Sequence, residues 1–240
     1  MKKLLTILLA FSTTASFAQN VRGGGWAEQF MVGASVSANT TWLLNDAVSN
    51  QRTGTTDLEF SMGYNVGITG GYHYNDHIAM GLDLQFFTLN QRYTGKDNAL
   101  FWESKVSLSG VQIPVYAKFM TSSGLFVEAG WQFSFVTSAQ YTRGITNGTE
   151  EPVDQDQSAT YSKVLYSPHL GLGMDWYLND MWVITTGLRA NYSINDLKGV
   201  DGQGRNVNTD PIYTDPKPTN ALSVGIFIGV RYMIDAGGRY

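Results

Sequence analysis

The three histidines are the residues of this chain best suited to proton transfer near neutral pH. His73, His77 and His169 could each serve as a general base beside a serine or aspartate. However, no nucleophile, base and orienting group occur together at a recognisable spacing. His73 and His77 flank one expected turn, and His169 follows Pro168 inside a strand pattern. We therefore predict no catalytic residues and a structural or surface role for each histidine.

Acidic side chains in two polar segments raise the possibility of divalent cation binding, because carboxylate oxygens are the ligands that Ca²⁺ and Mg²⁺ prefer. The residues concerned are Glu150, Glu151, Asp154, Asp156, Asp196, Asp201, Asp210 and Asp215. Their spacing matches no calcium loop, and the chain contains no cysteine that could hold a metal as thiolate. We predict a solvated acidic surface, with no metal site and no cofactor.

Six other charged residues stand at alternate positions of apolar strand patterns, on the face opposite to the apolar side chains. They are Asp83, Lys118, Glu128, Asp175, Arg189 and Arg231. Three are acidic and three are basic, and charges that are buried need partners. We therefore predict a paired charge network with a structural role. It would fill the interior of a small barrel, where side chains leave little room for a passage.

The elements that would position these charges are β-strands. Leu222, Val224 and Ile226 alternate with Ser223 and Gly225, and comparable alternation recurs through the chain. A period of two gives each strand one apolar and one polar face. We predict an all-β fold, an eight-stranded antiparallel up-and-down transmembrane β-barrel. The expected strands lie near residues 30–42, 60–74, 78–86, 106–119, 125–135, 170–176, 182–192 and 222–232.

Alternation alone does not say which face is inside, because a soluble eight-stranded barrel would have an apolar interior. The polar face carries many glycines, among them Gly67, Gly81 and Gly171, which would relieve crowding in a narrow lumen but weaken an exposed strand. The apolar face carries Trp131 and Trp182, which are too bulky for a small interior. The distribution favours lipid outside and a polar lumen inside.

The connections between strands alternate in length. Polar segments near 43–59, 94–105, 143–160 and 196–219 are long, and tight turns are expected at Asn75, Ser122 and Asn179. This alternation is typical of outer-membrane barrels with extracellular loops and periplasmic turns, so both termini of the barrel would be periplasmic.

Two local features of the fourth strand carry further predictions. Val106 and Leu108 are out of phase with Val111 and the apolar residues after it, so we predict a β-bulge near Ser109 and Gly110. Pro114 must sit at a bulge or give up a ladder hydrogen bond.

The N-terminus carries an export signal. Lys2 and Lys3 precede the apolar run 4–11, and small residues lead to Ala18, as in a secretory signal peptide. We predict a signal peptide at 1–18, a short periplasmic segment at 19–29 and the barrel at 30–240. The formal net charge is −4, and it is more negative without the two signal lysines, which excludes a basic nucleic-acid-binding protein.

Several segments resemble those of a known family. Residues 112–119, with Ile113-Pro114 and Lys118, the run 124–130, the Gly-Leu-Gly of 171–173 and the closing 229–232 are similar to PorT-type outer-membrane β-barrel proteins of Bacteroidetes, small barrels of the OmpA and OmpX kind. The resemblance implies barrel architecture, and the name-giving member implies a role in type IX secretion. Such barrels usually end on an aromatic residue, so either the last strand extends to Tyr240 or a short tail follows it.

These observations predict a non-enzymatic, porin-like integral protein of the cell outer membrane that acts as a scaffold or interaction protein. It would be an accessory to type IX secretion or envelope assembly. Its expected partners are outer-membrane lipid and lipopolysaccharide, together with secretion or envelope-assembly proteins, and nucleic acid is not among them. Two alternatives stay open: a small lipid-modifying outer-membrane enzyme and a narrow passive channel.

Overall fold

Eight long strands and two short ones make up the fold in the computed structural model, which describes residues 27–45, 56–97, 100–145, 153–156, 158–159, 161–198 and 218–235. The long strands are β1 (Gln29–Leu44), β3 (Met62–His73), β4 (Ile78–Asp97), β5 (Leu100–Met120), β6 (Leu125–Ile145), β8 (Val164–Tyr177), β9 (Trp182–Tyr192) and β10 (Asn220–Asp235). The short strands are β2 (Thr56–Glu59), which pairs with β4, and β7 (Val153–Asp156), which pairs with β6.

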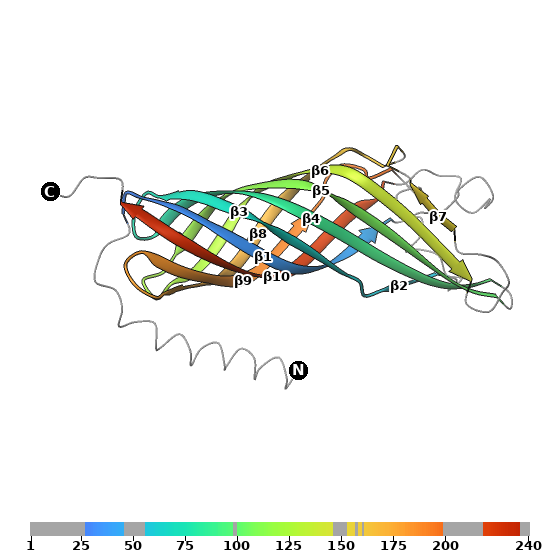
Figure 1. The fold of residues 1–240 in the computed structure, drawn as a ribbon, viewed down its shortest axis with the longest axis horizontal. Helices are drawn as coiled ribbons and strands as arrows, with labels where there is room; N and C mark the ends of the chain where they lie inside the picture. The colour runs from blue at the N-terminus through green and yellow to red at the C-terminus, as the bar shows by residue number, and fades with distance from the viewer. Residues whose placement is uncertain are drawn as a thin grey trace, which may run out of the picture.

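The eight long strands close into one ring. Each pairs antiparallel with its neighbours in the order β1, β3, β4, β5, β6, β8, β9, β10, and β10 pairs back onto β1. Figure 1 shows these strands side by side and strongly tilted around a common axis. Closure pairs the backbone of every long strand on both sides, which is what a sheet in lipid requires. The predicted fold class, an eight-stranded up-and-down barrel, is confirmed.

Tight turns join the strands at one end of the barrel, which we call the turn end; the opposite end is the loop end. At the turn end, the Asn75 side chain accepts hydrogen bonds from the backbone N–H groups of His77 and Ile78. Asn179 does the same for Met181 and Trp182. These local side-chain bonds stabilise the chain reversal, and the turns predicted at Asn75 and Asn179 are confirmed.

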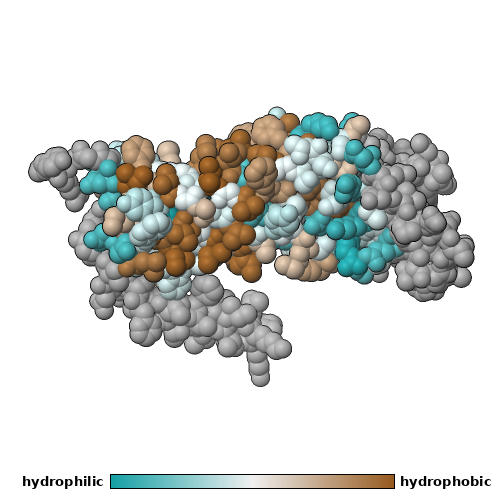
Figure 2. Space-filling view, in the orientation of Figure 1, coloured by the Kyte–Doolittle hydropathy of each residue, from teal (hydrophilic) through white to brown (hydrophobic). Residues whose placement is uncertain are grey.

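The outer face of the barrel carries an apolar band. Side chains such as Phe30, Ile68, Leu82, Val127 and Leu172 are exposed there. On the face drawn in Figure 2, hydrophobic side chains form a brown zone over the left and middle of the barrel, and hydrophilic side chains gather where β4, β5 and β6 run on toward the loop end. The next residue along each strand faces inward, so the outer apolar face and inner polar face have the predicted orientation across the band.

Beyond the apolar band, β4, β5 and β6 continue as a sheet that projects from the barrel (Figure 1). The segment 94–105, predicted to be a long connection, is therefore mostly strand: β4 runs to Asp97 and β5 begins at Leu100. The two faces exchange polarity in this projecting part. Thr88 and Asn90 of β4 lie on the outer face, whereas Phe87 and Leu89 are buried inside. The outer face meets water there, so polar side chains belong on it.

The predicted bulge lies at the predicted place, but the reason given for it was wrong. The register between β5 and β6 shifts between Ser109 and Gly110. The extra residue is Thr137 of β6, whose hydroxyl donates to the carbonyl of Ser109. β5 keeps its phase throughout, and Val106 and Leu108 point inward rather than toward lipid.

Because Thr137 shifts the phase of β6, Tyr141 packs against buried residues inside.

Pro114 gives up ladder bonding on one side of its strand. The register of β4 with β5 is interrupted between Leu82↔Val115 and Gln85↔Gln112, opposite Pro114, whereas the register with β6 runs on through Pro114↔Gln132. A proline nitrogen has no hydrogen to donate, so the interruption follows directly from the residue type.

Some sequence predictions fall outside the described residues. They include the signal peptide at 1–18, Tyr240, and most of the acidic residues of the polar segments. In the described part of the chain, no helix is both long and apolar enough to cross a membrane.

Candidate functional site

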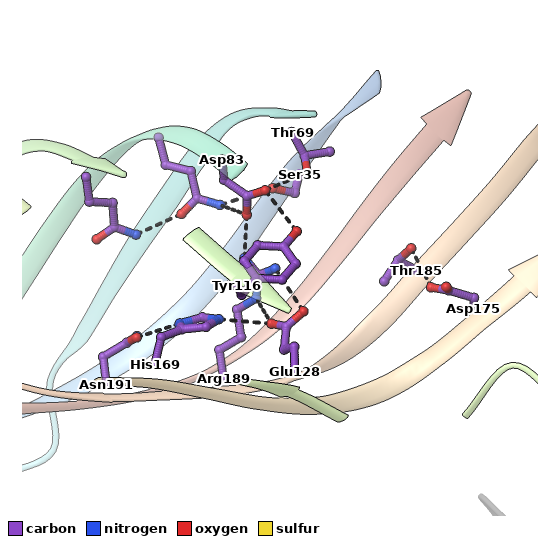
Figure 3. Close-up of polar contacts among 12 residues, drawn as sticks. Ser35, Thr69, Asp83, Tyr116, Glu128, His169, Asp175, Thr185, Arg189 and Asn191 are labelled. Carbon is purple, nitrogen blue, oxygen red and sulfur yellow. Dashed lines mark hydrogen bonds and ion pairs between the residues drawn. The ribbon is translucent and has the colours of Figure 1, made fainter. Parts of the chain in front are cut away.

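Arg189 is the centre of the charged interior. Its Nη1 donates to Asp83 Oδ2 at 2.7 Å and its Nε to Glu128 Oε1 at 2.6 Å, as Figure 3 shows. Asp83 also accepts from Thr69 at 2.5 Å and from the Tyr116 hydroxyl at 3.1 Å. The Arg189 side chain is one-tenth exposed and both carboxylates are fully enclosed. One guanidinium from β9 therefore holds two buried carboxylates, one from β4 and one from β6.

A second ion pair lies nearer the turn end. Lys118 Nζ donates to Asp175 Oδ2 at 2.6 Å, and both side chains are buried. Asp175 also accepts from Thr185 at 2.8 Å. Arg231 is more loosely placed, because its Nη1 lies 4.0 Å from Asp175 and its Nη2 lies 3.5 Å from the Tyr116 hydroxyl.

The structure thus brings all six predicted lumen charges into one cluster. They come one each from β4, β5, β6, β8, β9 and β10, point inward, and form the contacts just described. Three carboxylates face three cations, so the formal charges cancel. A balanced, hydrogen-bonded set is the form in which buried charge is tolerated.

His169 joins this cluster and has no free ring nitrogen. Its Nδ1 lies 2.7 Å from Asn191 Oδ1 and its Nε2 lies 3.1 Å from Glu128 Oε1 (Figure 3). A general base needs an unoccupied nitrogen facing the proton it removes. His73 and His77 stay near the turn end, where His77 Nδ1 contacts the Met120 carbonyl at 3.1 Å. The three histidines are not assembled into one site.

Glycines provide the space that the charged and aromatic side chains occupy. A Cβ on Gly171 would lie 2.5 Å from Glu128 Oε1, and one on Gly81 would lie 2.4 Å from the Tyr116 ring. At these distances the neighbouring side chain has to move. Gly171 and Gly81 thus leave the space that Glu128 and Tyr116 of the cluster occupy.

An amide ladder lies on the loop-end side of the charges. Gln132 donates to Gln112 at 3.2 Å, Gln112 donates to Gln85 at 2.7 Å, and Gln85 donates to Asp83 at 3.2 Å. The ladder borders a small polar cavity that has room for about one water molecule. The ladder connects three adjacent strands to the charge cluster.

An apolar cap closes the interior beyond the ladder. It consists of the buried residues Leu43, Phe87, Leu89, Tyr93, Val106, Leu108, Val136, Ala139, Tyr161, Leu165, Leu197 and Ala221, with Tyr141 packed against them. These residues come from strands around the ring and from the segments that follow β7 and β9. Sequence reasoning missed the cap. The signal that could have found it is the exchange of polarity between the two faces of β4 and β5 near Thr88 and Ser109.

The chemistry that this interior supports is limited. Charges, amides and apolar side chains fill successive layers, and the polar cavity beside the amide ladder holds about one water molecule. Among the described residues, no three potential metal ligands of the His, Cys, Asp or Glu type lie close enough to hold an ion. The arrangement favours a filled and rigid lumen over a substrate pocket.

A ring of eight tilted antiparallel strands with an apolar outer band and a filled polar lumen defines a small transmembrane barrel of the outer membrane. Residues 17–199 match the family model described as outer membrane protein beta-barrel domain, so the chain belongs to that family and is an outer-membrane protein. No curated protein matches the chain significantly.

Solved outer-membrane structures resemble the chain at low sequence identity. The outer membrane protein OprG from Pseudomonas aeruginosa is 13% identical, with a TM-score of 0.47, over 89% of this chain and 99% of that one. Neisserial surface protein A is 15% identical, with a TM-score of 0.40, over 85% and 96%. The outer membrane protease OmpT from Escherichia coli is 9% identical, with a TM-score of 0.40, over 90% and 100%. Likenesses of this degree say nothing about activity.

Proposed function

We propose that the protein is a closed, non-enzymatic outer-membrane barrel that acts as a scaffold or interaction protein. The observation that carries this proposal is the contrast between its interior and its loop end. The lumen is filled by the charge cluster, the amide ladder and the apolar cap, whereas β4, β5 and β6 project past the apolar band. Interaction surface is therefore concentrated on the projecting sheet and the connections around it.

The proposed orientation places the loop end outside the cell and the turn end, with both chain termini of the barrel, in the periplasm. Support comes from the tight turns at one end and the projecting sheet at the other, as in outer-membrane barrels generally. The chain lacks cysteine, so single cysteines report position cleanly. On intact cells, a membrane-impermeant maleimide should label Thr142→Cys and leave Ser122→Cys unlabelled until the outer membrane is disrupted. The reverse pattern would invert the orientation.

The finer role that we propose is that of an accessory to type IX secretion or envelope assembly. The support is the resemblance of the Ile113-Pro114 strand and the 171–173 segment to PorT-type barrels of Bacteroidetes. The test is cross-linking in native outer membrane, capture of the tagged protein in mild detergent and identification of co-purified proteins by mass spectrometry. Stoichiometric recovery of secretion or envelope-assembly components supports the role, and recovery of the barrel alone overturns it.

A variant with a shortened β4–β5 hairpin tests whether the hairpin tip is the surface that binds the captured partner. Thr94 and Glu103 are directly paired across β4 and β5, so an Asn-Gly turn can replace residues 95–102 without altering the strands below. The removed segment contains one Lys and one Asp, which leaves the net charge unchanged. The variant should keep heat-dependent gel mobility and lose the captured partner. Equal recovery with the full hairpin would exclude the hairpin tip as the interaction surface.

A further inference from the structure

The polar cavity beside the amide ladder lies in the lumen between the charge cluster and the apolar cap. Asn39 of β1, Asn65 of β3 and Arg189 of β9 line it, together with the three glutamines of the ladder. The cavity has room for about one water molecule. A ligand of this site is therefore no larger than water, and it meets side chains from strands on both sides of the ring.

Two side-chain oxygens at this cavity have no hydrogen-bond partner. They are Asn39 Oδ1 and Asn65 Oδ1. Asn39 is 5% exposed, and its Nδ2 donates to Ser223 Oγ at 3.2 Å, so the oxygen is the unpaired atom of this buried amide. A buried carbonyl oxygen without a partner costs free energy. The terminal torsion of an asparagine is broad, so each oxygen can turn onto a donor in the cavity.

The groups around the cavity select a neutral ligand. Arg189 lines the cavity, and its guanidinium would repel a cation. The unpaired carbonyl oxygens of Asn39 and Asn65 would repel an anion, because each carries a partial negative charge. A neutral molecule that donates two hydrogen bonds and accepts a third suits both kinds of group. Water has this combination and also fits the space.

We propose that one water molecule is a long-lived structural ligand of the lumen. It donates to Asn39 Oδ1 and Asn65 Oδ1 and accepts from the Arg189 guanidinium. This water connects β1 and β3, which contribute none of the six lumen charges, to the charge cluster. The inference rests on the proposed closed barrel, because in an open channel the site would hold one of many exchanging waters.

The same surroundings make the exchange of this water slow. The apolar cap lies on its loop-end side and offers it no hydrogen bond, and the charge cluster fills the lumen on its turn-end side. A water that leaves has to give up three hydrogen bonds and cross one of these layers. Exchange therefore requires a local opening of the barrel, which takes microseconds or longer.

A crystal structure of the full-length barrel at a resolution that shows ordered water tests the site directly. One water is expected within hydrogen-bond distance of Asn39 Oδ1, Asn65 Oδ1 and the Arg189 guanidinium. Crystals soaked in a thallium salt are the control, because the anomalous signal of Tl⁺ would mark a monovalent cation site. Thallium in the cavity, or a cavity without density, would overturn the inference and leave the closed barrel intact. A file of waters from the cavity to solvent would overturn both.

A double-mutant cycle tests whether the two asparagines share the water. Asn39→Leu and Asn65→Leu each keep the approximate size of the side chain and remove one acceptor. Because either change takes a partner from the water, the second should cost less stability than it costs in the wild type. Asn39→Leu with Asn75→Leu, in the turn between β3 and β4, is the control pair and should be additive. Additive losses for Asn39 and Asn65, in barrels of native heat-dependent gel mobility, would also overturn the shared water.

Discussion

The middle and the loop end of the lumen are filled in opposite ways. In the middle, Arg189 and Lys118 form ion pairs with three carboxylates, and glycines on the inner face leave space for these side chains. At the loop end, the cap packs aliphatic and aromatic side chains against each other. The charge cluster depends on every partner being present, because a lone buried charge is costly. The cap depends on volume, because each side chain that is removed leaves a void. The same ring of strands therefore contains one region sensitive to charge and one sensitive to size.

The largest effect should follow from removing the centre of the charge cluster. Arg189→Met replaces the guanidinium with an apolar side chain of roughly similar length. It leaves Asp83 and Glu128 without their shared cation. Breaking a buried ion pair on one side costs about 3–5 kcal/mol. The measurement is urea unfolding of the barrel in lipid vesicles. The paired replacement Lys118→Met with Asp175→Leu is the comparison, because it removes both members of a buried ion pair. It leaves Arg231 only its contact with the Tyr116 hydroxyl, so its loss should be smaller than that of Arg189→Met but not zero. Equal losses in both variants would show that bulk, and not charge, matters in the middle.

The next effect should come from the cap. Leu108→Ala removes a fully buried side chain and should lower the free energy of unfolding by about 2–4 kcal/mol, the cost of a core void. Val115→Ala on the same strand faces lipid, which refills the space, so its effect should be smaller. The same unfolding assay compares the two. A Leu108→Ala loss no greater than that of Val115→Ala would mean that the cap is not a packed core.

The two regions also differ in how far the sequence predicts them. Asp83, Lys118 and their partners stand out because a charge recurs on the polar side of an apolar alternation, so both their faces and their pairing could be expected. The direction of Val106 and Leu108 was predicted wrongly, because apolar side chains were expected to face outward along the whole strand. Once β4 and β5 leave the apolar band, water lies outside and packed side chains lie inside. Apolar residues therefore face inward and polar residues face outward, while the strand itself stays regular. The sequence pattern of β5 alone does not distinguish this exchange of faces from a bulge within β5. The register between β5 and β6 does, because it shows that the extra residue is Thr137 of β6.

A smaller effect is expected from adding one methyl group to the wall of the charge cluster. A Cβ at Gly171 would lie 2.5 Å from Glu128 Oε1, and the carboxylate would have to leave Arg189 and His169. Overpacking of this kind costs about 1–3 kcal/mol. Gly70→Ala is the control, because a Cβ there would meet nothing closer than 4.0 Å. Equal stability of the Gly171→Ala and wild-type barrels would show that the cluster is looser than its distances indicate.

The smallest effect should belong to a charge pair outside the lumen. Arg92 and Glu103 form an ion pair on the outer face of the projecting sheet, where both side chains are more than two-fifths exposed. Glu103 raises the pKa of Arg92 through its hydrogen bond and its negative charge, but both ions keep much of their hydration. Arg92→Ala should therefore change the free energy of unfolding by less than about 1 kcal/mol, and added salt should reduce even that difference. The charge swap, Arg92→Glu with Glu103→Arg, should restore wild-type stability while inverting the local surface charge. If the swap abolished partner capture and left unfolding unchanged, the outer face of the projecting sheet would be a recognition surface. Charge would then serve binding on this outer face, whereas in the middle of the lumen it serves the integrity of the barrel.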